Sequence, residues 1–387
     1  MAKKQQEKEE VVDSVKVAAE NFFKANKASI YTEELVSDPF MVSTGVIGLD
    51  TMLGGGVPSG ILVRLLGPPS SGKSSEGLLI IKNFLESRKK ARGLIIPTEA
   101  RLTEKLKSRS GVKFVHDPAD WVNGTCLILP MNIYEKIANF IWTLVKTNEL
   151  HKKEDRENFI VMIDCMDYLH LEDDFNKSFG ENNKVAGPQY MTKKIWSKMA
   201  LAFNAGQHIF LATSQQSAAP KIDPYAKDPL RQGGSSGGTN VQYQASLVLD
   251  FNTRFEGDYI LSDPDAKYDE RKNPKIGHIV KGIVRKSDNE KYDTRFEYAV
   301  KYGRTDGNSI WVEKDVLDQL ITWGLLGREG GKEKGSLCFE ASLYKELEAI
   351  DPDCPEKFRG LNAALKFLEG SPKVTAFLDE KLKNTLC

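Results

Sequence analysis

Apolar runs of strand length alternate with segments of helical character from about residue 43 onward. Helices are predicted over 75–85, directly after a glycine-rich turn, and over 133–145 and 191–203, where apolar residues recur at helical spacing. Alternating strands and helices are typical of an α/β fold with a mostly parallel central sheet. The predicted strands lie at 61–66, 93–99, 125–130, 159–164, 208–214, 245–251 and 278–284.

The two ends of the chain depart from this pattern. After Gly307 short helical patterns predict a small separate domain. We therefore expect an N-terminal helix and oligomerisation segment over 1–40, the α/β core over 41–306, and a small C-terminal α/β domain over 307–387. The N-terminal helix either packs on its own domain or docks onto a neighbouring subunit. Its apolar stripe consists of Val11, Val12, Val15, Ala18, Ala19, Phe22 and Phe23.

A phosphate-binding pattern follows the first predicted strand. The stretch from Gly67 to Ser74 matches Gly-x-x-x-x-Gly-Lys-Ser/Thr, and it has the strand, loop and helix order that this motif needs. Loop N–H groups and the helix N-terminus attract an anion, Lys73 would reach the β- and γ-phosphates, and Ser74 would bind Mg²⁺. The predicted ligand is a nucleoside triphosphate, contacted by Gly67, Pro68, Pro69, Ser70, Ser71, Gly72, Lys73, Ser74 and Ser75.

Three polar residues end other predicted strands. Asp164 ends an apolar run, where a carboxylate can hold Mg²⁺ or cap a helix. Glu99 can orient and deprotonate the water that attacks the γ-phosphate, or it is a solvated loop acid. Gln215 can contact the γ-phosphate and report whether it is present. Strand ends line the ligand crevice of such sheets, so we expect these residues near the phosphate loop.

A long stretch without periodicity follows Gln215. It contains Lys221, Tyr225, Lys227 and Arg231, and a glycine-rich run follows at 233–238. Loops of this length inside a compact domain are usually functional or disordered. Basic residues around an aromatic side chain suit single-stranded nucleic acid, which needs charge and stacking.

Composition excludes several classes of protein. Lys plus Arg and Asp plus Glu each number 54, so any nucleic-acid binding must come from a local patch. Apolar residues make up 40% of the chain without a long apolar run, so no membrane span is expected. The charged first ten residues lack the apolar segment of a signal peptide, which favours the cytosol. The five cysteines and five histidines show no zinc-site spacing.

Together these residues resemble the RecA family of DNA strand-exchange proteins. The segments 43–50 and 53–60 look like the family's lead-in to the phosphate loop, and GPPSSGKSS at 67–75 is close to its GPESSGKTT. Gly237, Gly238, Thr239 and Asn240 look like the GGNA that closes the second DNA-binding loop, and 360–368 resembles the GKANATAWL of the C-terminal domain.

The resemblance implies a role for each candidate residue. Glu99 matches the catalytic glutamate, Asp164 the Walker B carboxylate, and Gln215 the γ-phosphate sensor. Residues 172–187 would hold the first DNA-binding loop. Arg285, with Lys286 as a substitute, would reach the ATP of a neighbouring subunit. The implied cofactors are ATP and Mg²⁺, and the implied partners are single-stranded DNA, double-stranded DNA and further copies of the chain in a helical filament.

Two departures from the family pattern indicate which kind of RecA-like protein this sequence resembles. Leu106 stands where RecA proteins carry a tyrosine that stacks on adenine, and Ser287 stands where they carry a lysine. With the long second loop, these differences favour a bacteriophage recombinase of the UvsX type, located in the cytoplasm of the host cell. Our leading hypothesis is a DNA-dependent ATPase that catalyses homologous pairing and strand exchange. The alternatives are a hexameric helicase of the same fold and a non-catalytic ATP-binding mediator.

Overall fold

The computed structural model describes residues 16–26, 38–178, 187–215, 244–263, 266–288, 292–328 and 335–386. The chain forms two compact units, 1–38 and 39–387. The described part of the first unit is a helix over 16–25, on which Val17, Phe22 and Phe23 are exposed. Among the described helices, none is both long and apolar enough to cross a membrane.

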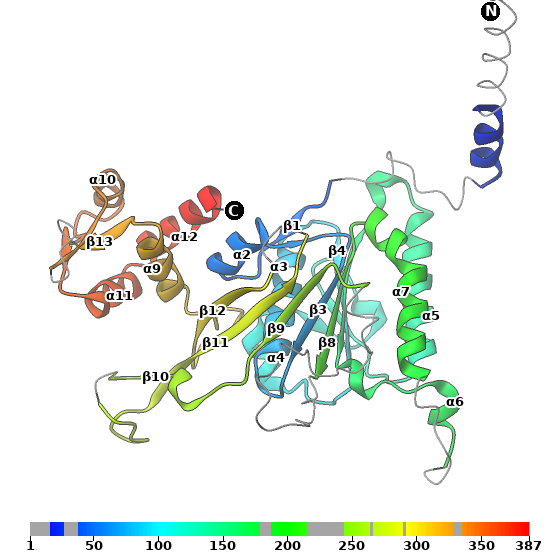
Figure 1. Ribbon diagram of the computed structural model, residues 1–387, viewed down its shortest axis with the longest axis horizontal. Helices are drawn as coiled ribbons and strands as arrows, with labels where there is room; N and C mark the ends of the chain where they lie inside the picture. The colour runs from blue at the N-terminus through cyan, green and yellow to red at the C-terminus, as the bar shows by residue number, and fades with distance from the viewer. Residues whose placement is uncertain are drawn as a thin grey trace, which may run out of the picture. The chain divides into compact units, whose positions relative to one another are not determined.

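A ten-stranded sheet forms the centre of the second unit (Figure 1). Seven neighbouring strands run parallel, and most of their residues are apolar and buried, as expected for a sheet covered on both faces. Their order across the sheet is β9 (Leu247–Phe251), β3 (Leu62–Gly67), β8 (Ile209–Gln215), β7 (Asn158–Asp164), β4 (Ala91–Pro97), β6 (Cys126–Ile128) and β5 (Phe114–Val115).

Three antiparallel strands extend the sheet beyond β9. The long strand β11 (Lys275–Lys286) pairs with β9 and also with β10 (Tyr259–Leu261) and β12 (Thr294–Lys301). A separate two-stranded sheet joins β1 (Met41–Val42) to β2 (Val57–Pro58).

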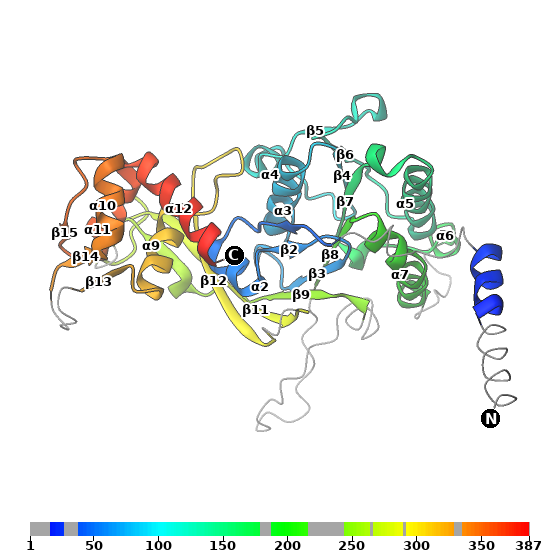
Figure 2. The same cartoon turned by 90° about the horizontal axis from the view of Figure 1, so that it is seen from above.

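Helices cover the sheet. The helix α3 (Lys73–Ser87) packs against β3, β4 and β7 and contacts α4 (Glu104–Ser110). The helices α5 (Tyr134–Glu149) and α7 (Gly187–Ala205) lie side by side in both views (Figure 2). Two shorter helices are α2 (Ile47–Leu53) and α6 (Glu172–Phe175).

A second apolar core lies in the C-terminal part of this unit. The antiparallel strands β13 (Leu326–Arg328), β14 (Leu337–Phe339) and β15 (Lys357–Phe358) form a small sheet. The helices that accompany them are α9 (Val312–Thr322), α10 (Ala341–Ile350), α11 (Leu361–Gly370) and α12 (Pro372–Leu386).

These observations confirm the predicted α/β class with a mostly parallel sheet. The sequence pattern missed β12, because its apolar residues are interrupted by Arg295 and Glu297 and form only a short continuous run at 298–300. It also missed the antiparallel pairing of β11 and β12, which strand periodicity does not encode.

A buried carboxylate links α2 to α9. Asp315 accepts a hydrogen bond from the Ile47 amide at 2.7 Å and is only 6% exposed. Burial raises the pKa of Asp315 to about 7, with smaller upward contributions from the charges of Asp318, Asp50 and Asp379. The hydrogen bond from Ile47 opposes the shift. The folded state therefore holds this proton at pH values where the unfolded chain has lost it.

Asp315→Asn should therefore stabilise the protein at pH 8 but leave it almost unchanged at pH 4. Between the unfolded pKa of 3.8 and the folded value of about 7, rising pH destabilises the wild type through this group. The slope is at most about 1.4 kcal/mol per pH unit. Urea unfolding at pH 4, 6 and 8 measures the difference, with Asp353→Asn, an exposed aspartate that does not act on Asp315, as control. An equal pH dependence in all three proteins would contradict the prediction.

Candidate nucleotide-binding site

The phosphate loop connects β3 to α3 in a tight turn. Gly67 and Gly72 have φ values of 143° and 113°, in the region that favours glycine. A Cβ atom on Gly67 would lie 2.5 Å from the carbonyl oxygen of Phe251, so a side chain cannot fit there. Glycine at these two positions thus allows the tight turn and the close approach of the loop to β9.

Lys73 is folded back onto this loop. Its Nζ donates hydrogen bonds to the carbonyl oxygens of Gly67 at 2.6 Å and Pro68 at 2.7 Å. Burial lowers the pKa of Lys73, and nearby acidic groups, among them Asp164 and Glu99, oppose the shift. Phosphate oxygens would offer this ammonium group charged acceptors in place of the two neutral carbonyls.

Ser74 and Asp164 meet at the end of β7. The Ser74 hydroxyl donates to Asp164 Oδ1 at 3.0 Å, and the Thr213 hydroxyl donates to the same oxygen at 2.6 Å. Burial raises the pKa of Asp164, while these two hydrogen bonds lower it. Hydroxyl and carboxylate oxygens suit Mg²⁺, which takes its other ligands from phosphates and water. No group of three or more His, Cys, Asp or Glu side chains that could hold a metal ion occurs in the described ranges.

Glu99 and Gln215 are hydrogen-bonded to each other. The Gln215 amide donates from Nε2 to Glu99 Oε1 at 2.9 Å, and Arg101 forms an ion pair with Glu99 Oε2 at 3.3 Å. The backbone N–H of Gln215 donates to Asp167 Oδ2 at 2.7 Å. Asp167 is a site residue that the sequence analysis missed, because it lies in a short turn after β7.

Sheet register explains why these residues meet. Gly67 pairs with Gln215 between β3 and β8, and Pro97 pairs with Asp164 between β4 and β7. The carboxyl ends of four adjacent strands therefore place Lys73, Asp164, Glu99 and Gln215 around one crevice, as in other open α/β sheets.

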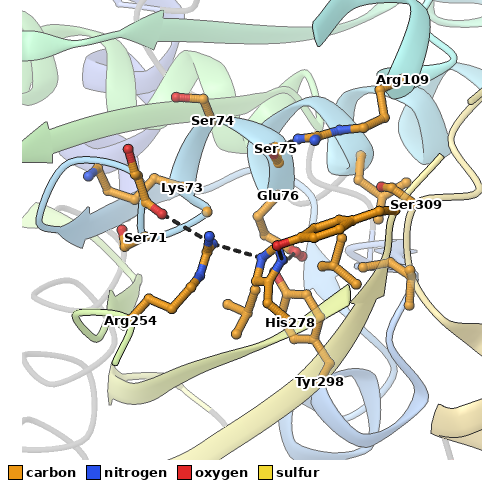
Figure 3. Close-up of a pocket in the computed structure, with 17 residues that line it drawn as sticks. Ser71, Lys73, Ser74, Ser75, Glu76, Arg109, Arg254, His278, Tyr298 and Ser309 are labelled. Atoms are coloured by element: carbon orange, nitrogen blue, oxygen red, sulfur yellow. Dashed lines mark hydrogen bonds between the residues drawn. The ribbon is translucent and has the colours of Figure 1, made fainter. Parts of the chain in front are cut away.

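A cavity of about 400 Å³ opens beside the phosphate loop. This volume is within the range of small-molecule sites. Figure 3 shows Arg109 from α4 and Arg254 from the segment after β9 on either side of the loop, with His278 of β11 below Arg254. Glu76 and Tyr298 form part of its wall, where the Tyr298 hydroxyl donates to Glu76 Oε2 at 2.6 Å.

The sequence pointed to the loop residues 70–75 that line this cavity, but not to the residues from other elements that line it. Arg109 follows Leu106 by nearly one turn of α4, but Leu106 packs against the main core and does not line the cavity. Arg254 and His278 lie far from the loop in sequence and meet it only through the order of strands in the sheet.

The other predicted site residues lie elsewhere. Arg285 forms ion pairs with Asp250 at 3.1 Å and Asp293 at 2.7 Å in its own chain. Lys286 ends β11, and neither residue lines the cavity. Residues 172–178 of the predicted first DNA-binding loop include α6. The predicted DNA contacts lie outside the described residues: Lys221, Tyr225, Lys227, Arg231, Gly237, Gly238 and Asn240.

Comparison with known proteins gives a weak but consistent result. No protein-family model matches the chain. It is 26% identical over 204 residues to the DNA repair and recombination protein RadB of Methanobrevibacter smithii, covering 52% of this chain and 77% of that protein. It is 24% identical over 216 residues to RadB of Methanosphaera stadtmanae, covering 56% and 82%. These similarities support a relationship to the RecA family, and they give no support to the bacteriophage branch.

Proposed function

We propose that the protein is an ATPase of the RecA type that acts in DNA repair and recombination. One observation carries the nucleotide part of this proposal: the hydrogen bond between Ser74 and Asp164 beside Lys73. A phosphate-loop hydroxyl paired with a strand-end carboxylate is the arrangement that holds Mg²⁺ on a bound triphosphate. The similarity to RadB supports the recombination part.

The chain's own residues account for the steps of hydrolysis. The loop N–H groups would bind the phosphates, and Lys73 would exchange its two carbonyl partners for phosphate oxygens. Ser74 and Asp164 would hold Mg²⁺, which neutralises charge that develops on the phosphates. Glu99 would orient the attacking water and accept its proton. For this, Glu99 must give up the hydrogen bond from Gln215 or share it with the water.

The same hydrogen bond suggests how nucleotide and DNA are coupled. Gln215 contacts the proposed base through its side chain and directly precedes the segment predicted to bind DNA. A γ-phosphate that draws the amide away from Glu99 would change the start of that segment and free the base together. DNA bound to that segment would also weaken the hydrogen bond between Gln215 and Glu99. DNA would therefore raise the rate of hydrolysis.

The finer parts of the hypothesis follow from the resemblance. These are a helical filament on single-stranded DNA, homologous pairing and strand exchange, and contact of Arg285 or Lys286 with a neighbour's ATP. The bacteriophage origin depends on Leu106, Ser287 and the long segment after Gln215. The alternatives, a ring-shaped helicase and a non-catalytic mediator, predict different assemblies and different activities.

ATP hydrolysis with and without single-stranded DNA tests the proposal. We expect DNA to stimulate turnover, and we expect D-loop formation when ATP, a single strand and a homologous duplex are present. Hydrolysis without DNA stimulation would favour the mediator. Negative-stain images of the ATP and DNA complex that show closed rings would favour the helicase over a filament.

A further inference from the structure

Two arginines contact the phosphate loop from within the same chain. Arg254 donates from Nη2 to the carbonyl oxygen of Ser70 at 3.2 Å, and Arg109 donates from Nη2 to the Ser75 hydroxyl at 2.9 Å. Both line the cavity (Figure 3). Within the described part of the chain, neither forms an ion pair with a carboxylate, so their charges face the loop uncompensated by a direct partner.

His278 holds Arg254 in place. The distance between Arg254 Nη2 and His278 Nε2 is 2.7 Å. A guanidinium group has donors only, so His278 Nε2 must be the acceptor and the ring must be neutral. The remaining proton is then on Nδ1, which lies 3.1 Å from the Tyr302 hydroxyl and donates to it. Burial, with a smaller contribution from Arg254, lowers the pKa of His278 to about 4, which agrees with a neutral ring.

The position of the cavity indicates which part of a nucleotide the arginines meet. The cavity is lined by the loop and helix residues 70–76, whereas Glu99, Asp164 and Gln215 do not line it. The residues proposed to activate water and sense the γ-phosphate are therefore outside the cavity, whereas Lys73 and Ser74 line it. The arginines thus lie where the α- and β-phosphates leave the loop toward the nucleoside.

The arginine expected to act between subunits is held by carboxylates of its own chain. Arg285 is held by Asp250 and Asp293, and Ser287 carries no charge. Among the described residues, Arg109 and Arg254 form no ion pair with a carboxylate, and both already contact the loop. A guanidinium group binds phosphate oxygens with paired, charge-assisted hydrogen bonds, which its present contacts to a carbonyl and a hydroxyl do not match.

We propose that Arg109 and Arg254 bind the α- and β-phosphates of the nucleotide from within the same subunit, and that His278 positions Arg254 for this contact. The inference rests on the proposed nucleotide site but goes beyond it. Nucleotide affinity would then be set largely inside one subunit, before any neighbour contributes a residue.

Equilibrium binding of fluorescent ADP and ATP to the full-length protein tests this. Arg254→Ala and Arg109→Ala should each weaken the binding of both nucleotides by about tenfold or more, and by the same factor for ADP as for ATP. Arg254→Lys should lie between, because an ammonium group keeps the charge but cannot form the paired hydrogen bonds of a guanidinium group with phosphate oxygens. His278→Phe should weaken binding less than Arg254→Ala. Arg271→Ala, an exposed arginine after β10, serves as control.

The possible outcomes separate this inference from the proposed function. If the wild type binds and the two alanine variants, shown to be folded by circular dichroism, bind equally well, the inference fails alone. A loss confined to ATP would assign the arginines to the γ-phosphate and overturn it. A loss seen only at protein concentrations where the chain assembles would assign them to a neighbour's site, which also overturns it. If the wild-type protein binds neither nucleotide, both the inference and the proposed function are wrong.

Discussion

Glu99→Gln should slow ATP turnover by at least about a hundredfold while ATP binding stays intact, in line with the usual contribution of a general base. The amide keeps the size of the side chain and an oxygen that accepts from Gln215 as Oε1 does at 2.9 Å, so the site should keep its geometry. It cannot accept a proton from water. Phosphate release at saturating ATP gives the turnover, and fluorescent ATP gives the affinity.

Glu104→Gln is the matched control for this variant. Glu104 lies in the first turn of α4, and its side chain is 90% exposed and paired with Lys107. Turnover should be unchanged in this control. If Glu99→Gln also hydrolyses ATP at the wild-type rate, Glu99 is a structural partner of Gln215 and another group activates the water.

Asp164→Asn should remove the advantage that Mg²⁺ gives to ATP binding and lower turnover by about a hundredfold or more, comparable to the loss of one charge-stabilising group. The amide oxygen can still accept from Ser74 and Thr213, which contact Oδ1 at 3.0 and 2.6 Å in the wild type. What it loses is the negative charge that attracts the ion.

The measurement compares ATP affinity in Mg²⁺ and in EDTA. In the wild type, Mg²⁺ should tighten binding; in Asp164→Asn the two values should converge. Asp120→Asn, an exposed aspartate after β5, is the control. An unchanged response to Mg²⁺ in Asp164→Asn would show that other groups hold the ion.

The sequence could predict that the candidate residues gather at one edge of the sheet, because that edge is built from strand ends. Lys73, Asp164, Glu99 and Gln215 each follow an apolar run, and parallel strands bring such positions to one side of a sheet. Which strands are neighbours did not need to be known, since the ends of β3, β8, β7 and β4 all lie at the same edge.

The cavity residues that come from other elements could not be predicted, because for most of them the order of the strands must be known. Arg254 and His278 reach it because the antiparallel strand β11 adds to β9, next to β3. Strand order and direction arise from packing over the whole sheet. The local sequence around Arg254 or His278 does not predict them. Arg109 lies in a charged surface helix, where an arginine by itself does not indicate a binding site.

For the proposed ATPase, the contact between Glu99 and Gln215 also bears on the rate of ATP hydrolysis when no DNA is present. With its carboxylate engaged by the Gln215 amide and by Arg101, the proposed base has little capacity left for water. In the proposed ATPase, such a resting state would slow the hydrolysis of ATP in the absence of DNA. The protein could then remain loaded with nucleotide for long periods and begin to consume it only once a DNA strand arrives.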